Sequence, residues 1–494
     1  MSSAANGKGQ QLSPASLHIQ TAKRSSDMNE VILPDYQYFI DSKRVFDKPT
    51  GLVELPELNR KLKPHQHDIV TWALRRGRAA VFAGTGLGKT FMQLEWAHRV
   101  AEKTGKPSLI LAPLAVGAQT EREGAHWGIP AKYYKEHAEF NAGEIVVTNY
   151  DRLQRFNADD FGAVVLDESS ILKASDGKTR QLITETFQGT PFRLACTATP
   201  APNDYMELGN HAEFLGVMTQ EEMLAMFFIH DGGETQKWRL KGHAESEFWK
   251  WMCSWAVMLR KPSDLGYPND GYDLPELNLH QITVDVDQGR AQDTLFVMEA
   301  ATLQERLQER RQTIKERCEA ASEIINSKPD ESWLVWTNLN DEAEMIASMV
   351  NGVNVQGSDK PEIKERNLLK FTDGDIRVLV SKPSIAGFGM NWQHCANMVF
   401  VGLNDSYEQL FQAIRRCWRF GQTREVNVWL VAAETEGRVV SNLKRKEADA
   451  ERMAEMMVQH MQDITVAELR GTTRVKTEYN ASNDLILPNW LEAA

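Results

Sequence analysis

The sequence predicts an α/β protein with two tandem parallel-sheet domains and a helical insertion between them. Three observations lead to this prediction: the chain has 494 residues, it contains two separate sets of short apolar runs, and helical stretches alternate with those runs. A chain of this length accommodates two or three domains. Short runs that are apolar throughout are typical of strands buried on both faces of a parallel sheet, and their alternation with helices favours a repeated βα unit.

The first domain is expected over residues 56–204, after an N-terminal extension over 1–55 that shows no sustained periodicity. Its predicted strands are Ala79–Phe82, Ser108–Ala112, Glu144–Val147, Ala163–Leu166 and Phe192–Ala195. The helical patterns between these runs predict a doubly wound sheet.

The second domain is expected over residues 331–436. Its predicted strands are Trp333–Trp336, Gly352–Val355, Arg377–Val380, Met398–Val401 and Val426–Val431. Residues 205–330 are predicted to form a helical insertion and the linker, because aromatic residues from Phe248 to Trp255 and apolar residues from Leu303 to Ile325 recur at helical spacing. Residues 437–494 are expected to form a charged amphipathic helix, over 437–463, and a tail.

Composition restricts the class of protein. The chain has 56 Lys and Arg against 68 Asp and Glu, a net charge of −12, so nucleic-acid binding would need a local groove rather than bulk positive charge. No apolar run is long enough for a membrane span, and the polar N-terminus does not resemble a signal peptide. The five cysteines have no C-x-x-C spacing, which disfavours a disulfide framework or a zinc site. We therefore expect a cytoplasmic protein without a membrane partner.

A glycine-rich loop, Ala83-Gly-Thr-Gly-Leu-Gly-Lys-Thr90, follows the first predicted strand and opens a helix. Its glycines allow backbone N–H groups to surround a phosphate at the N-terminus of that helix. Lys89 is expected to reach the β- and γ-phosphates of ATP, and the Thr90 hydroxyl to bind Mg²⁺. The loop residues predicted to contact the nucleotide are Gly84, Thr85, Gly86, Leu87, Gly88, Lys89 and Thr90.

Two carboxylates, Asp167 and Glu168, end the strand that begins at Ala163. Asp167 is expected to hold Mg²⁺, and Glu168 to orient and deprotonate the attacking water. Such a pair at a strand end is ordinary by itself, but together with the phosphate loop it predicts an ATP-hydrolysing site.

At this point the sequence resembles the Swi/Snf-type remodelling and translocase ATPases of helicase superfamily two, over about residues 60–430. The resemblance implies two RecA-like lobes. It also implies that Gln66, the last residue of Leu62-Lys-Pro-His-Gln66, recognises adenine. Pro113 of Leu111-Ala-Pro-Leu-Ala115 is likewise expected to contact a nucleic-acid strand. Cys196-Thr-Ala-Thr-Pro-Ala-Pro-Asn203 resembles the motif that couples hydrolysis to movement. The other expected nucleic-acid contacts of this lobe are Thr148, Asn149, Tyr150, Thr197 and Thr199.

In the second lobe, the segment from Ser381 to Asn391 resembles a motif that approaches both the nucleotide cleft and the nucleic acid. The resemblance implies nucleic-acid contacts by Ser381 and Asn391. Gly387 and Gly389 are expected near the nucleotide. Gln412-Ala-Ile-Arg-Arg-Cys-Trp-Arg-Phe-Gly-Gln422 is the most specific match, and it makes Arg416 and Arg419 candidate arginine fingers, expected on one helix face.

Some positions depart from the family pattern. Ser169 and Ser170 stand where Ala and His are usual, Lys382 stands where Thr is expected, and Arg415 replaces an acidic residue. None of these changes removes a group needed for hydrolysis. They leave the coupling and the choice of nucleic-acid track open.

The sequence therefore predicts an ATP-dependent nucleic-acid motor, with double-stranded DNA as the first choice of track. A strand-separating helicase acting on DNA or RNA is the alternative. A catalytically inactive nucleic-acid-binding scaffold is disfavoured by intact Lys89, Asp167, Glu168, Arg416 and Arg419. A small-molecule kinase would explain only the first domain.

Overall fold

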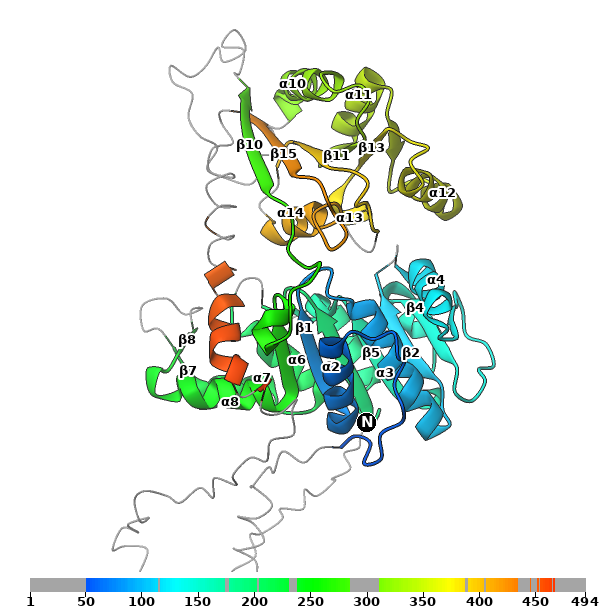
Figure 1. Ribbon diagram of the computed structural model, residues 1–494, viewed down its shortest axis with the longest axis vertical. Coiled ribbons are helices and arrows are strands. Elements are labelled where there is room, and N and C mark those ends of the chain that lie inside the picture. The colour runs from blue at the N-terminus through cyan, green and yellow to red at the C-terminus, as the bar shows by residue number, and fades with distance from the viewer. Residues whose placement is uncertain are drawn as a thin grey trace, which may run out of the picture. The chain divides into compact units, whose positions relative to one another are not determined.

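The computed structural model contains two α/β lobes, each with its own parallel sheet (Figure 1). The structure describes residues 50–113, 116–173, 177–201, 204–230, 238–284, 311–386, 390–403, 406–433, 445, 451–452, 454–463 and 465–466. The predicted N-terminal extension, apart from its last six residues, lies outside them.

The sheet of the first lobe has the strand order β3-β4-β2-β5-β6-β1-β9, and all its described pairings are parallel. Its strands are β1 (Arg78–Ala83), β2 (Ser108–Ala112), β3 (Ala131–Tyr133), β4 (Ile145–Asn149), β5 (Ala163–Asp167), β6 (Phe192–Thr197) and β9 (Ala256–Leu259). The five predicted strands of this lobe are confirmed. Their side chains are buried on both faces, as the uniform apolar runs indicated.

Helices cover both faces of this sheet, and two apolar clusters lie on its opposite sides. The helices are α2 (Pro64–Arg76), α3 (Lys89–Thr104), α4 (Gly117–Trp127) and α5 (Lys178–Thr186), with 3₁₀ turns η1 (Tyr150–Arg155), η2 (Ala158–Asp160) and η3 (Ser169–Lys173). Helix α3 begins at the glycine-rich loop and buries Phe91, Leu94 and Ala97 against the sheet. Because β1 and α3 are both anchored in the core, the loop between them is held at the carboxyl end of the sheet.

The segment from 205 to 330 is not purely helical, which corrects one expectation. It contains α6 (Glu207–Leu215), α7 (Gln220–Phe227), the antiparallel hairpin β7 (Phe228–His230) and β8 (Trp238–Leu240), η4 (Gly242–Ala244), α8 (Glu245–Trp255), β9, η5 (Pro262–Leu265), β10 (Leu277–Val284) and α10 (Ile314–Asn326). Strand β9 joins the first sheet and β10 joins the second. Strand β9 follows α8 without a break, so its four apolar residues continue the helical pattern in the sequence. The domain boundaries remain a prediction.

The sheet of the second lobe has the strand order β10-β15-β14-β11-β13-β12, again with parallel pairings. Its further strands are β11 (Trp333–Thr337), β12 (Val353–Val355), β13 (Val378–Ser381), β14 (Asn397–Val401) and β15 (Val426–Ala433). Its helices besides α10 are α11 (Asn340–Val350), α12 (Pro361–Thr372), α13 (Pro383–Ala386) and α14 (Tyr407–Ile414). The five predicted strands are confirmed. Strand β10 was missed, because its alternating polar residues belong to a half-exposed edge strand.

Helical residues near the C-terminus, within 451–466, pack against the first lobe (Figure 1). Met457 and Met461 are buried in its core cluster, and the His460 ring stacks on Trp249 of α8 with 5.4 Å between ring centroids. The chain thus returns to the first lobe after completing the second sheet. Among the described residues, no helix is both long and apolar enough to cross a membrane.

Candidate active site between the lobes

The glycine-rich loop forms a cradle at the end of β1. Gly86 and Gly88 have φ of 91° and 80°, a left-handed conformation that favours glycine. The Lys89 ammonium lies across the loop and donates to the carbonyl oxygens of Ala83 and Gly84 at 2.9 and 3.4 Å. Burial lowers the pKa of Lys89, and the neighbouring Glu168 and Asp167 oppose that shift. Thr85 and Leu87 lie in the same loop and Thr90 in the first turn of α3, and of these three side chains only that of Leu87 is buried.

The carboxyl end of β5 brings Asp167 beside this cradle. Asp167 is 7 % exposed, and one of its oxygens accepts from the Gln93 amide at 2.8 Å. Burial, together with the charge of Glu168, raises the pKa of Asp167 to about 6, and the Gln93 hydrogen bond and Lys89 oppose the shift. Burial and the neighbouring Glu168 therefore favour the neutral Asp167 carboxyl more than Gln93 and Lys89 favour its ionised form.

Glu168 occupies a strained backbone position. Its φ is 54°, in the left-handed region that residues with a Cβ rarely adopt, at a cost of about 1–3 kcal/mol. Its carboxylate accepts from the Thr197 hydroxyl at 3.4 Å, and the Thr199 N–H donates to the same hydroxyl at 3.1 Å. The Tyr150 hydroxyl donates to the Asp167 carbonyl at 2.7 Å. Segments that are far apart in the sequence thus fix the turn after β5.

Gln66 joins the predicted adenine motif to the phosphate loop. Its side chain is 5 % exposed, accepts from the Lys63 N–H at 3.0 Å and donates to the Leu87 carbonyl at 3.0 Å. The Lys63 ammonium lies 4.2 Å from the Tyr272 ring centroid and 4.6 Å from that of Phe420. The sequence analysis did not single out Tyr272 or Phe420, since an isolated aromatic residue in a linker or after a motif carries no distinct signal.

The two candidate arginine fingers follow α14, which ends at Ile414, so the expectation that they share a helix face is wrong. The reason is local. The Arg416 guanidinium Nε donates to the Gln412 carbonyl at 3.0 Å, the acceptor that the next helical N–H would otherwise use. The Arg416 N–H instead bonds the Ala413 carbonyl at 3.2 Å, which tightens the chain into turns.

Arg416 and Arg419 differ in their partners. Arg416 is 3 % exposed and also donates to the Met390 carbonyl at 3.3 Å and to the Gln412 side chain at 3.2 Å. The buried Nε of Arg419 has no hydrogen-bond partner. Burial lowers the pKa of both groups, that of Arg419 to about 10, and the negative charge of Glu168 opposes each shift. Both arginines therefore lie close enough to Glu168 to interact with its charge.

The turn that carries these arginines lies directly against the phosphate loop. A Cβ added at Gly86 would come within 2.9 Å of the Phe420 backbone nitrogen. The structure thus brings Lys89, Asp167, Glu168, Arg416 and Arg419 to one place between the lobes.

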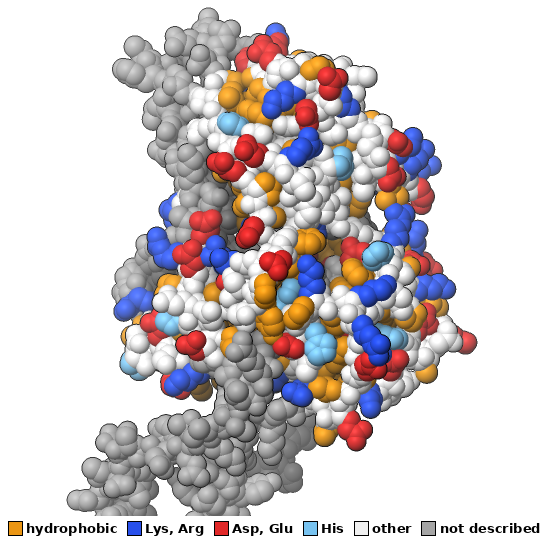
Figure 2. Space-filling view, in the orientation of Figure 1, with side chains coloured by type: hydrophobic (Ala, Val, Ile, Leu, Met, Phe, Trp, Pro, Cys, Tyr) orange, Lys and Arg blue, Asp and Glu red, His pale blue; other side chains and the backbone are white. Residues whose placement is uncertain are grey.

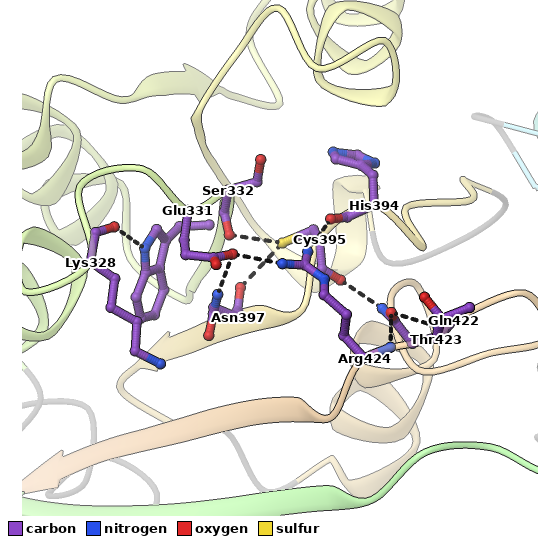
Figure 3. A network of polar contacts seen from close by, with 10 residues as sticks. Lys328, Glu331, Ser332, His394, Cys395, Asn397, Gln422, Thr423 and Arg424 are labelled. Atoms are coloured by element: carbon purple, nitrogen blue, oxygen red, sulfur yellow. Dashed lines mark hydrogen bonds and ion pairs between the residues drawn. The ribbon is translucent and has the colours of Figure 1, made fainter.

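Gln422 fixes the far end of this turn (Figure 3). Its side chain is 6 % exposed and donates to the carbonyls of Cys395 and Cys417 at 3.1 and 3.3 Å. Its oxygen accepts from the N–H groups of Thr423 and Arg424, each at 3.0 Å. The glutamine that closes the arginine motif is therefore a backbone clamp. Sequence reasoning recognised the residue but not this function.

Several predicted nucleic-acid contacts have inward-facing side chains. Thr148 and Asn149 are 0 % and 1 % exposed, and they donate to the carbonyls of Tyr134 at 2.8 Å and Pro113 at 3.0 Å. Thr197 and Ser381 are also buried, and the Ser381 hydroxyl donates to the Val355 carbonyl at 3.0 Å. In the structure these side chains bind neighbouring carbonyl or carboxylate groups at the strand ends, and their contact with nucleic acid stays a prediction.

The remaining nucleic-acid candidates, Pro113, Tyr150, Thr199 and Asn391, are half-buried. The Asn391 side-chain oxygen is buried without a hydrogen-bond partner. Gly387 and Gly389 lie outside the described residues.

Comparisons with known proteins agree with this organisation. A family model described as "Type III restriction enzyme, res subunit" matches residues 59–202, and one described as "Helicase conserved C-terminal domain" matches 316–421. The putative protein p41 of Acyrthosiphon pisum secondary endosymbiont phage 1 is 26 % identical over 423 residues, 74 % of this chain and 89 % of that protein.

Among solved structures, the Sulfolobus solfataricus SWI2/SNF2 ATPase core in complex with dsDNA matches with a TM-score of 0.40 and 18 % identity, over 85 % of this chain and 99 % of that one. The two family models fall on the two lobes whose strand ends form the site, in the order expected for a tandem RecA-like ATPase. The two family-model matches support a helicase-like ATPase of superfamily two.

Proposed function

We propose that this chain is an ATP-dependent motor that translocates on double-stranded DNA, in the manner of the Swi/Snf-type ATPases. The meeting of Lys89, Asp167 and Glu168 from one lobe with Arg416 and Arg419 from the other is the observation that carries the proposal. Two lobes that share one hydrolytic site can close and open once per ATP, and this movement ratchets them along a track.

Each charged group has a task in this proposal. The loop N–H groups and Lys89 bind the phosphates, and Gln66 recognises adenine. Glu168 orients the attacking water and takes its proton. Arg419, whose Nε has no hydrogen-bond partner, stabilises charge on the departing phosphate. Arg416 holds in place the turn that carries both arginines, residues 415–421, which we call the finger turn.

The residues at the loop also fit a magnesium ion. Asp167 is a buried carboxyl group whose pKa is raised to about 6 by burial and by Glu168, and a cation bound there would stabilise its ionised form. The Thr90 hydroxyl and Asp167 would hold it, with the phosphates completing its shell. When bound, the ion neutralises phosphate charge during hydrolysis.

The proposed DNA track rests on the motif resemblance and on the charge distribution. Positive and negative side chains are interspersed over the described part of the face shown in Figure 2. A chain with net charge −12 and such a surface needs a defined groove to bind phosphates. Phosphate contacts carry no sequence information, so we expect binding that weakens steeply with salt and shows little sequence preference.

Steady-state ATP hydrolysis with no nucleic acid, single-stranded DNA, double-stranded DNA or RNA tests the proposal. Duplex DNA should stimulate hydrolysis most, and Lys89→Ala should abolish turnover. Displacement of a third strand from a triplex, without separation of the duplex, should accompany hydrolysis. Unwinding at a rate that matches ATP turnover would instead identify a helicase. Turnover unaffected by Lys89→Ala would contradict the proposed site.

A further inference from the structure

The conformation of Glu168 has to be maintained by its surroundings. A residue with a Cβ at φ 54° relaxes to a lower-energy backbone unless neighbouring contacts hold it. On the N-terminal side, the Tyr150 hydroxyl and the Gln93 amide hold Asp167, at 2.7 and 2.8 Å. On the C-terminal side, the chain continues directly into η3, so the contacts of η3 decide where the Glu168 carboxylate points.

His211 of α6 provides the contact at the start of η3. Its Nε2 lies 3.1 Å from the Ser169 hydroxyl oxygen, and its Nδ1 lies 3.4 Å from the Glu207 carbonyl oxygen. Ser169 and His211 are both fully buried. Because a hydroxyl both donates and accepts, this pair forms with either tautomer of the ring. Burial lowers the pKa of His211 to about 4, so the ring is neutral at physiological pH.

The neighbouring residue, Asn210, holds the other end of the same turn. Its side-chain amide donates to the Lys173 carbonyl, the last residue of η3, at 3.1 Å. Two side chains of α6 therefore form hydrogen bonds with the first and the last residue of η3. The same stretch of chain begins at Thr197, whose hydroxyl donates to the Glu168 carboxylate at 3.4 Å. One continuous segment, from the end of β6 through α6, thus contacts Glu168 itself and the turn that follows it.

His211 also touches the strand that leads into the phosphate loop. Its ring meets Phe82 of β1 edge to face, with 5.2 Å between centroids, and β1 ends one residue later at Ala83. The imidazole is therefore packed between the phosphate-loop strand and the turn after the catalytic carboxylates. The imidazole that contacts this turn comes from α6, 42 residues further along the chain than Ser169.

We infer that His211 is a positioning residue for hydrolysis: through Ser169 it holds the strained turn that aims the Glu168 carboxylate, and it links that turn to the Thr197 segment. The inference rests on the proposed role of Glu168. The described contacts of His211 are with the turn, with its own helix and with Phe82 of β1, so its loss should slow the chemical step without weakening ATP binding.

Three variants test this inference: Ser169→Ala, His211→Leu and the double variant. In the double variant both polar partners are replaced by apolar groups, which costs little stability compared with leaving one buried group unpaired. Each variant should lower kcat on the order of tenfold, with KM for ATP and the affinity for a fluorescent ATP analogue unchanged. The losses should not add, since each change removes the same contact. A stably folded double variant with the parent kcat would overturn the inference.

Phe214→Leu is the matched control, because Phe214 is a fully buried residue of the same helix. It should lower the unfolding temperature and leave kcat unchanged. A kcat loss equal to that of Ser169→Ala would show that loosening of α6 in general is responsible, and would overturn the positioning role. Glu168→Gln separates the two proposals: if it retains turnover, the proposed function of Glu168 fails, whatever the other variants show.

Discussion

The two lobes have the same architecture but hold their charged groups in different ways. The first lobe places Lys89, Asp167 and Glu168 at the carboxyl ends of β1 and β5, where helices and strands fix the backbone on both sides. The second lobe places Arg416 and Arg419 in turns after a short helix, α14. Buried strands as well as hydrogen bonds therefore position the groups of the first lobe, whereas Arg416 of the second lobe lies in a turn held by hydrogen bonds.

The two arginines of the second lobe differ in their hydrogen bonds. Arg416 is bound by Gln412 and by the Met390 carbonyl, but the Nε of Arg419 is buried without a partner. An unpaired buried donor is unfavourable until a ligand satisfies it. The comparison suggests that the first lobe supplies a preformed site, and that Arg419 is the group whose interactions change when ATP is present.

The largest effect should come from the arginines. Arg419→Ala should lower kcat about 10³-fold, because a finger that stabilises transition-state charge contributes roughly this much. Its unfolding temperature should stay near that of the parent. Arg416→Ala should lower both kcat and the unfolding temperature, since it removes bonds within its own lobe. Arg415→Ala is the control and should change kcat little. Equal loss of stability in the Arg416 and Arg419 variants would remove the distinction between them.

The next effect is a pH dependence of the first lobe. Burial and Glu168 raise the pKa of Asp167 from 3.8 to about 6, so its carboxyl stabilises the free protein below the unfolded value and loses that contribution as pH rises through 6. Magnesium binding needs the ionised form. Below pH 6 the Mg²⁺ concentration for half-maximal hydrolysis should therefore rise about tenfold per pH unit.

Metal titration, rather than thermal unfolding, checks this pH dependence. Burial lowers the pKa of His65 and of His211 to about 4. These two groups therefore make the folded protein less stable as pH falls below 6.5, whereas Asp167 makes it less stable as pH rises. In Asp167→Asn the dependence on pH should disappear. A midpoint that is constant between pH 5 and 7 in the parent would contradict the shifted carboxyl.

A smaller effect is expected at the clamp of the second lobe. Gln422→Ala should destabilise the protein by about 1–3 kcal/mol, because its hydrogen bonds to the Cys395 and Cys417 carbonyls are buried. Gln422→Glu is the matched variant, since it keeps an acceptor for Thr423 and Arg424 but loses the donor to Cys395 and Cys417. Denaturant unfolding measures both. If both variants have the same free energy of unfolding as the parent, the hydrogen bonds of Gln422 do not position the finger turn.

The smallest effect concerns the C-terminal helical residues. Glu455 pairs with Arg260 at 3.1 Å, and both side chains are exposed. Glu455→Ala should cost about 0–1 kcal/mol and less at high salt, because water screens such pairs. A salt-independent loss of several kcal/mol would show that charge, rather than Met457 and Met461, holds this segment on the first lobe.

Ten strands of the two sheets could be predicted because most are short runs of apolar residues, which is typical of buried parallel strands. The phosphate loop and the pair Asp167–Glu168 were also predictable, since glycines and charged groups at fixed spacing carry their chemistry locally. The strands β3, β9 and β10 escaped prediction: β3 has only three residues, β9 continues the helical pattern of α8, and β10 alternates polar and apolar residues instead of forming a uniform apolar run.

Only the tertiary structure decided which side chains serve the site from a distance. His211 lies 42 residues from Ser169, and Tyr150 lies 17 from Asp167, so no local spacing predicts their hydrogen bonds. It also decided that Thr148 and Asn149 face inward and that the helix before Arg416 ends early. A sequence pattern indicates the chemistry that a side chain can perform and whether its segment has the periodicity of a helix or of a strand. Packing determines which partner a buried polar group finds, because that partner comes from elsewhere in the chain.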